Sequence, residues 1–516
     1  MDPVTRHNET PDVAFDGGDL DCGNGLLLLI RKHIDPLPRG GLLEIRSTEI
    51  SVDEDLPAWC RLTGNDLVSW TKDGKQRSFL VCKGKIEERN TAPSPTATTA
   101  AARPAPSPQP AAKPATEPTT EPAPRRAAPI PAPAVPALAV MGMGSWPRPR
   151  WMTEALHAHV EGRLDERPFQ DTADDAVRLV VGAQERAGVD VMTDGEQRRD
   201  SYASFIATRL DGCQLVPLID LLPLVDHPEE FEAELRALDV PAGDVRHPGV
   251  FGRIRRSRPI AGHELDFLRT VTDKPAKIAL PGPYLLTRTM WMECISEQVY
   301  ASREDIAQDI VRVLREEIAD LLDGGAALIQ LDEPVLSEVV FTGAKNKRSF
   351  MCGALSESLG PAHELGFARD LMNAVVDGLP RERIAVHVCR GNWTPDESVA
   401  LSGSYAPLVE TLAAMRVGGY LLEMCTPRAG EMEILKALPQ DARIGVGVVN
   451  QKHAETETLD EVAAKIRHAA NLFGRERLLL HPDCGFATFA DNPICSATHA
   501  QDKLAVIARA AATLRG

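Results

Sequence analysis

The sequence predicts an α/β protein in which a (β/α)8 TIM barrel follows a small βαβαββ two-layer sandwich and a disordered linker. Three observations lead to this prediction. Short apolar runs alternate with longer amphipathic segments over residues 137–516. A denser pattern of strands and helices occupies residues 18–85, and residues 86–136 consist largely of Pro, Ala and Thr. A hydrophobic content of 43% over 516 residues supports a large core.

The N-terminal region predicts a small folded module. Residues 1–17 are polar, and we expect them to be disordered. A short strand near Leu20 and a buried helix at 25–34 precede a strand at 42–47. Ser51 and Glu54 have the spacing of a capping box that opens the next helix. Two strands at 66–71 and 77–82 complete the order as a hairpin.

Several stretches of this module resemble the TusA family of small sulfur carriers. They are Leu20-Asp21, residues 29–32, residues 42–45 and residues 55–64. The resemblance implies a sulfur-relay protein as a partner. That family has a Cys-Pro-x-Pro motif before its first helix, whereas this chain reads Cys22-Gly23-Asn24. Cys22 still precedes a helix, where the dipole favours a reactive thiolate. It is therefore either a sulfur-carrying nucleophile or a buried structural residue.

Residues 86–136 show no periodic apolar face. Their composition is typical of a disordered chain with polyproline character. We expect this segment to act as a tether that lets the module approach the following domain without a fixed contact.

Eight apolar runs predict the strands of the barrel. They are 138–143, 189–193, 277–280, 326–331, 384–388, 420–424, 443–449 and 478–481. Helical patterns lie between them at 171–187, 303–323, 365–378, 405–417 and 459–473. Eight such repeats predict a parallel barrel with right-handed connections. Residues 210–275 are charged and lack the alternation, so we interpret them as an insertion.

Reactive side chains follow the predicted strands, at the edge where barrel enzymes carry their chemistry. His387 and Cys389 are two residues apart, which places them on one face of a strand. Glu423 and Cys484 end two other runs. A lone His-x-Cys pair is more often part of a core, but this combination of ligand types favours a zinc site.

These motifs resemble the catalytic C-terminal barrel of cobalamin-independent methionine synthases, including their single-barrel relatives. The matching stretches are residues 143–148, 194–196, 330–334, 387–389, Glu423 and 482–485. The resemblance implies zinc (Zn2+) bound by His387, Cys389, Glu423 and Cys484. It also implies that Gly144, Ser145, Glu196 and Asp332 hold the amino-acid end of a small thiol such as homocysteine.

The chemistry that this site implies is the transfer of a methyl group to a thiol. Zinc binding converts a thiol to a nucleophilic thiolate at neutral pH. The leaving group then needs a proton, for which His453 and Lys452 are the two candidates. Catalytic zinc usually has three protein ligands, so we expect Glu423 to loosen or the coordination to expand.

The methyl donor stays open at this point. The full-length family has a second barrel that helps to bind methylfolate, and here the TusA-like module and linker precede the catalytic barrel. Methylfolate and a corrinoid are therefore both possible donors. Two further reactions are alternatives: opening of an epoxide by the thiolate, and formation of a C–S bond with sulfur relayed from Cys22. We regard a non-catalytic scaffold as the weakest interpretation.

Charge and composition exclude other classes of function. The formal net charge of −17 argues against nucleic acid or an anionic membrane as a partner. No apolar run approaches the length of a membrane span, and no signal-peptide pattern opens the chain. We therefore expect a cytoplasmic protein whose ten cysteines are mostly free thiols.

Overall fold

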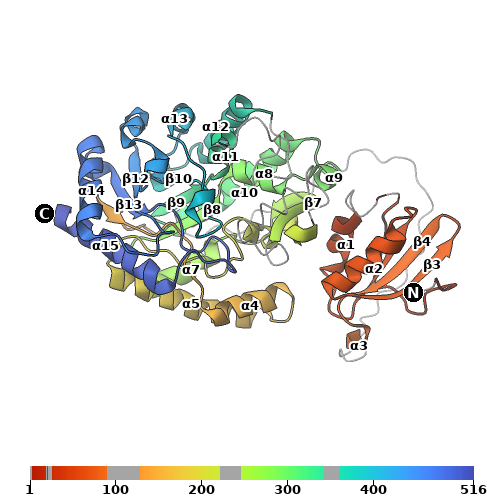
Figure 1. Ribbon diagram of the computed structural model, residues 1–516. Coiled ribbons are helices and arrows are strands. Elements are labelled where there is room, and N and C mark those ends of the chain that lie inside the picture. Colours follow the sequence, from red (N-terminus) through yellow and green to blue (C-terminus); the bar gives the residue numbers. More distant parts are fainter. Residues whose placement is uncertain are drawn as a thin grey trace. The chain divides into compact units, whose positions relative to one another are not determined.

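The computed structural model describes residues 3–18, 20, 26–89, 128–220, 246–341 and 359–515 (Figure 1). The chain divides into two compact units, residues 1–125 and 126–516. Cys22 and most of the expected linker, residues 90–127, lie outside the described residues. The first residues of that linker form a short helix, α3 (Ile86–Arg89).

The N-terminal unit has one four-stranded sheet and two main helices. In chain order its elements are β1 (Val13–Asp16), α1 (Leu26–Ile34), β2 (Leu42–Ser47), α2 (Val52–Thr63), β3 (Asp66–Asp73) and β4 (Gln76–Cys82). The sheet order is β1-β2-β4-β3, with β1 parallel to β2 and the other pairs antiparallel. Apolar side chains of α1 and α2 form one core with β2 and β4. The expected element order βαβαββ is therefore present.

Two expectations for this unit were wrong. The first strand is Val13–Asp16 rather than a segment near Leu20, because Val13–Asp16 pair with β2 in register. Residues that we expected to be disordered thus belong to the sheet. Ser51 precedes α2 but has helical angles, φ −60° and ψ −26°, and its side chain makes no capping hydrogen bond. A capping serine needs an extended backbone, so the predicted capping box does not form.

A curled parallel sheet forms the centre of the second unit. Its strands are β5 (Ala139–Val140), β8 (Lys277–Pro281), β9 (Leu328–Asp332), β10 (Ile384–Val388), β11 (Gly419–Leu422), β12 (Arg443–Val449) and β13 (Leu478–Pro482). The order is β5-β13-β12-β11-β10-β9-β8, and all pairs are parallel. The predicted run 189–193 contributes single bridges, Met141–Val191 and Met192–Ala276, which link the two edge strands.

Helices surround this sheet (Figure 1). They are α4 (Arg150–Val160), α5 (Glu166–Ala187), α7 (Gly262–Val271), α8 (Pro283–Met290), α9 (Glu293–Ser296), α10 (Arg303–Asp323), α11 (Val335–Phe341), α12 (Pro361–Val376), α13 (Ala406–Ala413), α14 (Leu459–Phe473) and α15 (Ala497–Arg515). Every residue of β8, β9, β10, β11 and β13 is buried. The prediction of an α/β fold with a parallel sheet is thus confirmed, and the carboxyl ends of its strands meet at one edge.

Residues 210–275, which we interpreted as an insertion, contain a separate two-stranded sheet that is not part of the parallel sheet. Strands β6 (Leu210–Pro217) and β7 (Arg246–Arg256) pair antiparallel, and α7 follows them. Glu317 of α10 fixes this region: its carboxylate accepts hydrogen bonds from Arg256 Nε at 2.7 Å and from the backbone N–H groups of Ile260 and Ala261. A local sequence pattern cannot predict a contact between residues this far apart in the sequence.

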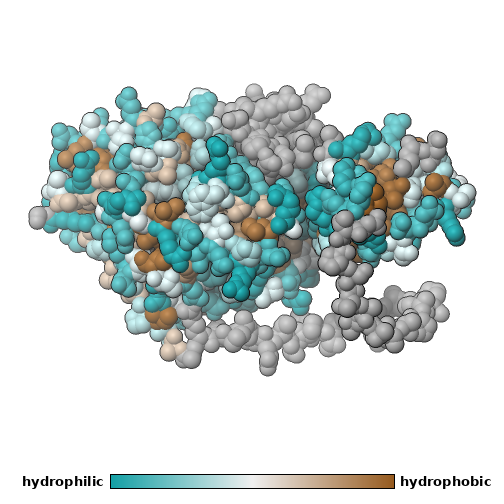
Figure 2. Space-filling model, turned by 90° about the horizontal axis from the view of Figure 1, so that it is seen from below, coloured by the Kyte–Doolittle hydropathy of each residue, from teal (hydrophilic) through white to brown (hydrophobic). Residues whose placement is uncertain are grey.

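The face of the molecule drawn in Figure 2 is predominantly hydrophilic, with small and separate apolar patches. Among the helices of the described residues, none is both long and apolar enough to cross a bilayer.

Candidate functional site

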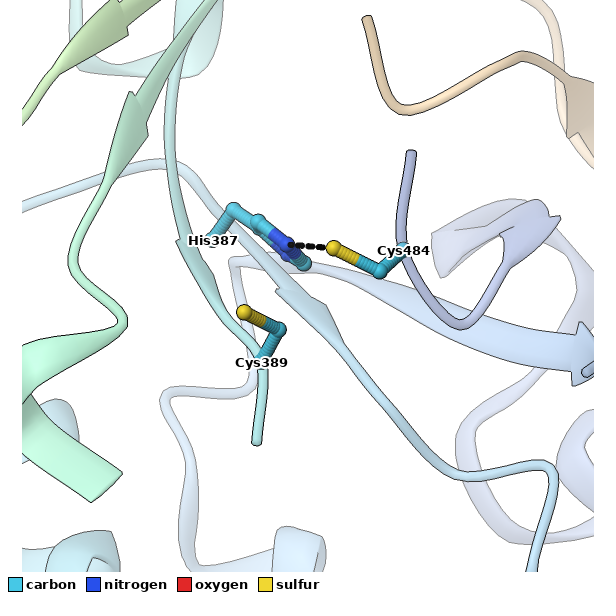
Figure 3. A group of neighbouring side chains, drawn as sticks. All are labelled: His387, Cys389 and Cys484. Atoms are coloured by element: carbon cyan, nitrogen blue, oxygen red, sulfur yellow. Dashed lines mark hydrogen bonds between the residues drawn. The ribbon is translucent and has the colours of Figure 1, made fainter. Parts of the chain in front are cut away.

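Three side chains converge at the carboxyl ends of β10 and β13. His387 lies near the end of β10, Cys389 follows that strand, and Cys484 follows β13. One ligand atom from each lies within 4.8 Å of those of the other two, and all three residues are buried. Figure 3 shows the three side chains pointing toward one another. The Sγ atom of Cys484 lies 3.7 Å from Nε2 of His387.

A hydrogen bond fixes the orientation of the imidazole. Nδ1 of His387 lies 2.9 Å from the carbonyl oxygen of Leu421 in β11. A carbonyl only accepts, so Nδ1 carries a proton, and Nε2 is the ring nitrogen that faces the thiols. Histidines that bind metals commonly have this second hydrogen bond.

The two thiols titrate as a pair. Hydrogen bonding from Cys484, and then from His387, holds the pKa of Cys389 well below its usual value. The same pairing raises the pKa of the Cys484 thiol well above its usual value. One proton therefore leaves easily and the second only with difficulty. A cation that replaces the second proton stabilises the doubly ionised pair.

The structure does not bring Glu423 into this group. Its carboxylate accepts a hydrogen bond from the backbone N–H of Arg390 at 3.1 Å and forms an ion pair with Arg428. Arg428 also pairs with Glu397. Burial raises the pKa of Glu423, and the neighbouring Arg428 opposes that shift. Glu423 thus has other partners among the described residues and is not part of the group of His387, Cys389 and Cys484.

Ser145 and Glu196 line the same pocket as Cys389 and Cys484. Glu196 has φ +54°, a left-handed conformation that is rare for a residue with a side chain. Gly144 permits this arrangement, since a Cβ atom there would collide with the Glu196 carboxylate. Burial raises the pKa of Glu196 to about 7. Ser145 Oγ accepts a hydrogen bond from the N–H of Ala487 and keeps its own proton for another acceptor.

Asp332 lines the same pocket from the end of β9. Its Oδ1 accepts a hydrogen bond from Nε2 of Gln330 at 2.7 Å. Burial raises the pKa of Asp332, whereas His387, Gln330 and Lys277 lower it. The two carboxylates of Glu196 and Asp332 therefore share one buried pocket with the sulfur atoms.

The two proton-donor candidates occupy different places. Lys452 is buried and lines the pocket, and burial lowers the pKa of its ammonium group. The side chain of His453 is 54% exposed, and its Nε2 lies 2.9 Å from Glu397. His453 is not among the residues that line the pocket. The neighbouring positions point apart because the chain turns at Asn450, whose side chain accepts the N–H of Lys452.

Sequence reasoning missed a buried pair of amides that connects the loops of the site. Nε2 of Gln451 donates to Oδ1 of Asn392 at 2.7 Å, and Nδ2 of Asn392 donates to the carbonyl of Gly485 at 2.7 Å. Oε1 of Gln451 accepts the N–H of Cys484 at 3.2 Å. The loops that carry Cys389, Lys452 and Cys484 are thus tied together. No sequence pattern marks an amide that satisfies partners on two other loops.

The fold and this site define a barrel-type α/β protein with a sulfur and imidazole group at its catalytic edge. A model of the family described as cobalamin-independent synthase, catalytic domain, matches residues 138–220 and 237–511. Because these residues make up more than half of the sequence, the chain belongs to this family.

Named relatives share most of their length with this chain. The methionine synthase of Sulfolobus acidocaldarius is 27% identical over 346 residues, which cover 66% of this chain and 84% of that protein. The methionine synthase of Sulfurisphaera tokodaii is 28% identical over 352 residues, which cover 68% and 86%.

A solved structure shows the same fold. It is a B12-independent methionine synthase from a Shewanella species in complex with selenomethionine, with a TM-score of 0.56 and 23% identity. The alignment covers 73% of this chain and 98% of that chain. At this identity the likeness concerns the fold.

Proposed function

We propose that the second unit is a zinc-dependent methyltransferase that activates homocysteine or a similar thiol and yields methionine or a related thioether. The observation that carries this proposal is the convergence of His387, Cys389 and Cys484 beside Ser145, Glu196 and Asp332 in one pocket. The names of the relatives support methyl transfer to homocysteine over the epoxide and sulfur-relay alternatives.

The donor set fits zinc. Two thiols and one imidazole are soft or borderline ligands, which suit zinc and disfavour magnesium and calcium. His387, Cys389 and Cys484 would hold the ion, and Glu423 would join them when its carboxylate leaves Arg428. Bound zinc lowers the pKa of a coordinated thiol so that a thiolate is available at neutral pH.

The remaining residues of the pocket suit the amino-acid end of the substrate. Glu196 and Asp332 accept hydrogen bonds from an α-ammonium group, and the hydroxyl of Ser145 donates to the α-carboxylate. This arrangement fixes the thiol end toward the sulfur and imidazole group. Holding both reactants in place lowers the activation free energy by several kcal/mol, because the effective molarity of well-oriented reacting groups is large.

Lys452 is the better candidate for protonating the leaving group. Its ammonium group lies in the pocket, whereas His453 is paired with Glu397 away from it. A correctly placed general acid typically contributes about 10²- to 10⁴-fold to the rate. Lys452→Met should therefore lower kcat by about that factor, and His453→Gln should leave kcat within about threefold of wild type.

The methyl donor is methylfolate or a corrinoid in this proposal. For the N-terminal unit we propose a TusA-like role, in which Cys22 carries sulfur. The observed βαβαββ order supports this resemblance, although the order occurs in other small domains as well.

The test combines metal analysis with product analysis on the full chain. We expect about one zinc per chain, a count that corresponds to a single tetrahedral site, and methionine from homocysteine with either methylcobalamin or methyltetrahydrofolate. Cys389→Ala should lose both zinc and product, whereas Cys495→Ala in the same unit should keep both. A folded protein that binds no zinc, or that makes methionine equally well after zinc removal, would refute the proposal. Product that survives Cys22→Ala would separate methyl transfer from the sulfur relay.

A further inference from the structure

A buried lysine, Lys277, lies near Asp332 and Glu196, the two carboxylates that we propose bind the substrate. It has no role in the chemistry described above. Lys277 is the first residue of β8, and only 1% of it is exposed. Its Nζ donates hydrogen bonds to the carbonyl of Met143 at 2.9 Å and to Oε1 of Gln330 at 2.5 Å. Both acceptors are neutral. Burial lowers the pKa of Lys277 to about 7, although nearby Asp332 and Glu196 favour its charged form.

Such a lysine is costly to a folded protein. A buried ammonium group loses its hydration, and neutral acceptors recover only part of that loss. Apolar replacements of buried charges are often neutral or stabilising. Stability alone therefore gives no reason for a lysine at this position.

The hydrogen bonds of Lys277 fix the orientation of an amide. Nζ of Lys277 donates to Oε1 of Gln330, and the charged form of the lysine can only donate, so the amide oxygen faces Lys277. The NH2 group of the same amide then faces the other way, and its Nε2 donates to Oδ1 of Asp332 at 2.7 Å. Gln330 is 2% exposed, and both ends of its amide have a protein partner.

The strand geometry keeps this chain of contacts in place. Gln330 and Asp332 are two residues apart on β9 and therefore point to the same face. Ala279 and Pro281 of β8 pair with them in register, so β8 and β9 hold all three polar residues on one side of the sheet. The result is a row from Met143 through Lys277 and Gln330 to Asp332.

Loss of Lys277 would free the amide to rotate. A rotated Gln330 would place its oxygen against the carboxylate of Asp332, and the two oxygens would repel each other. Asp332 would then turn away from its position at the pocket. With Lys277 in place, Oδ1 of Asp332 accepts the hydrogen bond from Gln330, and we expect the other carboxylate oxygen to bind the ligand.

We propose that Lys277 and Gln330 are positioning residues that orient Asp332 toward the α-ammonium group of the thiol substrate, and that they make the pocket selective for amino-acid thiols over thiols without an amine. This inference rests on the proposed function. It adds the structural origin of substrate selectivity.

The experiment compares two thiols that differ only in the amine. Homocysteine and 4-mercaptobutanoate share the carbon chain, the thiol and the carboxylate. Binding of each is measured by titration calorimetry on the zinc-loaded full chain, so that the result does not depend on the methyl donor. Variants are Lys277→Met and Gln330→Met. Lys274→Met is the matched control, because its Nζ donates to the carbonyl of Val189 outside the pocket.

We expect wild type to prefer homocysteine. Each of the two pocket variants should weaken homocysteine binding by about 10- to 100-fold, the range typical of a hydrogen bond to a charged group. Their affinity for 4-mercaptobutanoate should stay within about threefold of wild type. Where turnover is measurable, the loss should appear mainly in KM rather than kcat.

Other outcomes overturn the inference. Equal weakening of both thiols would indicate a merely structural role, and an unchanged preference in Lys277→Met would show that the row does not orient Asp332. If Lys277→Met does not fold, Gln330→Met provides the same comparison with the lysine retained. Wild-type protein that binds neither thiol would refute the proposed function itself.

Discussion

The cysteines of the two units show what burial does to a thiol and what a partner does. Cys60 and Cys82 in the N-terminal unit are buried, and burial raises their pKa to about 12 and about 11. Cys389 in the second unit is also buried, but Cys484 and His387 hold its pKa well below the usual value. Burial alone raises the pKa of a thiol and makes it unreactive. A hydrogen-bonding partner at a buried site lowers the pKa and makes the thiol reactive.

The largest effect is expected when one thiol is removed from each unit. Cys389→Ala should weaken zinc binding by more than about 100-fold, because even residues that only support a ligand change affinity by up to that factor. Cys82→Ala should leave zinc affinity unchanged. Competition with a chelator of known affinity measures both. Equal losses in the two variants would mean that the cysteines of the second unit are not ligands.

Alkylation rates sharpen the same contrast. In zinc-free native protein at pH 7, iodoacetamide should modify Cys389 more than about 100-fold faster than Cys60 or Cys82, since each pKa unit changes the thiolate fraction about tenfold. The rate at Cys60 should rise only as the pH approaches 12, because its pKa is raised. Peptide mass spectrometry locates the label. Rapid labelling of Cys60 at neutral pH would contradict the assignment, and zinc should protect Cys389.

A smaller effect is expected from the amides behind the metal ligands. Gln451→Ala removes the contacts to Asn392 and to the N–H of Cys484, and should weaken zinc binding by about 10- to 100-fold. Gln440→Ala is the matched control, because the hydrogen bonds of that amide lie at the surface. A Gln451 variant with wild-type zinc affinity would show that the loops hold their positions without this contact.

The smallest effect concerns the residues that precede α2 and α14, one in each unit. Thr458→Ala should lower the free energy of unfolding by about 1 kcal/mol, because Thr458 and Glu461 form a reciprocal capping box at α14. Ser51→Ala should change it by less than about 0.5 kcal/mol, because the Ser51 side chain caps nothing. Urea denaturation measures both. Similar losses of unfolding free energy in the two variants would indicate that Ser51 does cap α2, as the sequence predicted.

The sequence by itself determined the features that depend on local pattern. Apolar runs and helical periods predicted β10 and β12 and helices α10 and α14 with the bounds that the structure has. Residue type and place after a strand singled out His387, Cys389 and Cys484, and parallel strands brought them together. The run at 189–193 forms single parallel bridges rather than a full strand, and the first strand lies at Val13–Asp16 rather than near Leu20, because pairing with neighbours decides where a weak strand forms.

Only the tertiary structure decided which partner each polar side chain has. Glu423 pairs with Arg428, Lys452 but not His453 lines the pocket, and Lys277 donates a hydrogen bond to Gln330. These choices depend on side chains that are far apart in the sequence. Hydrogen bonds and ion pairs act over a few ångströms, so their partners follow from the packing of the barrel rather than from any local pattern.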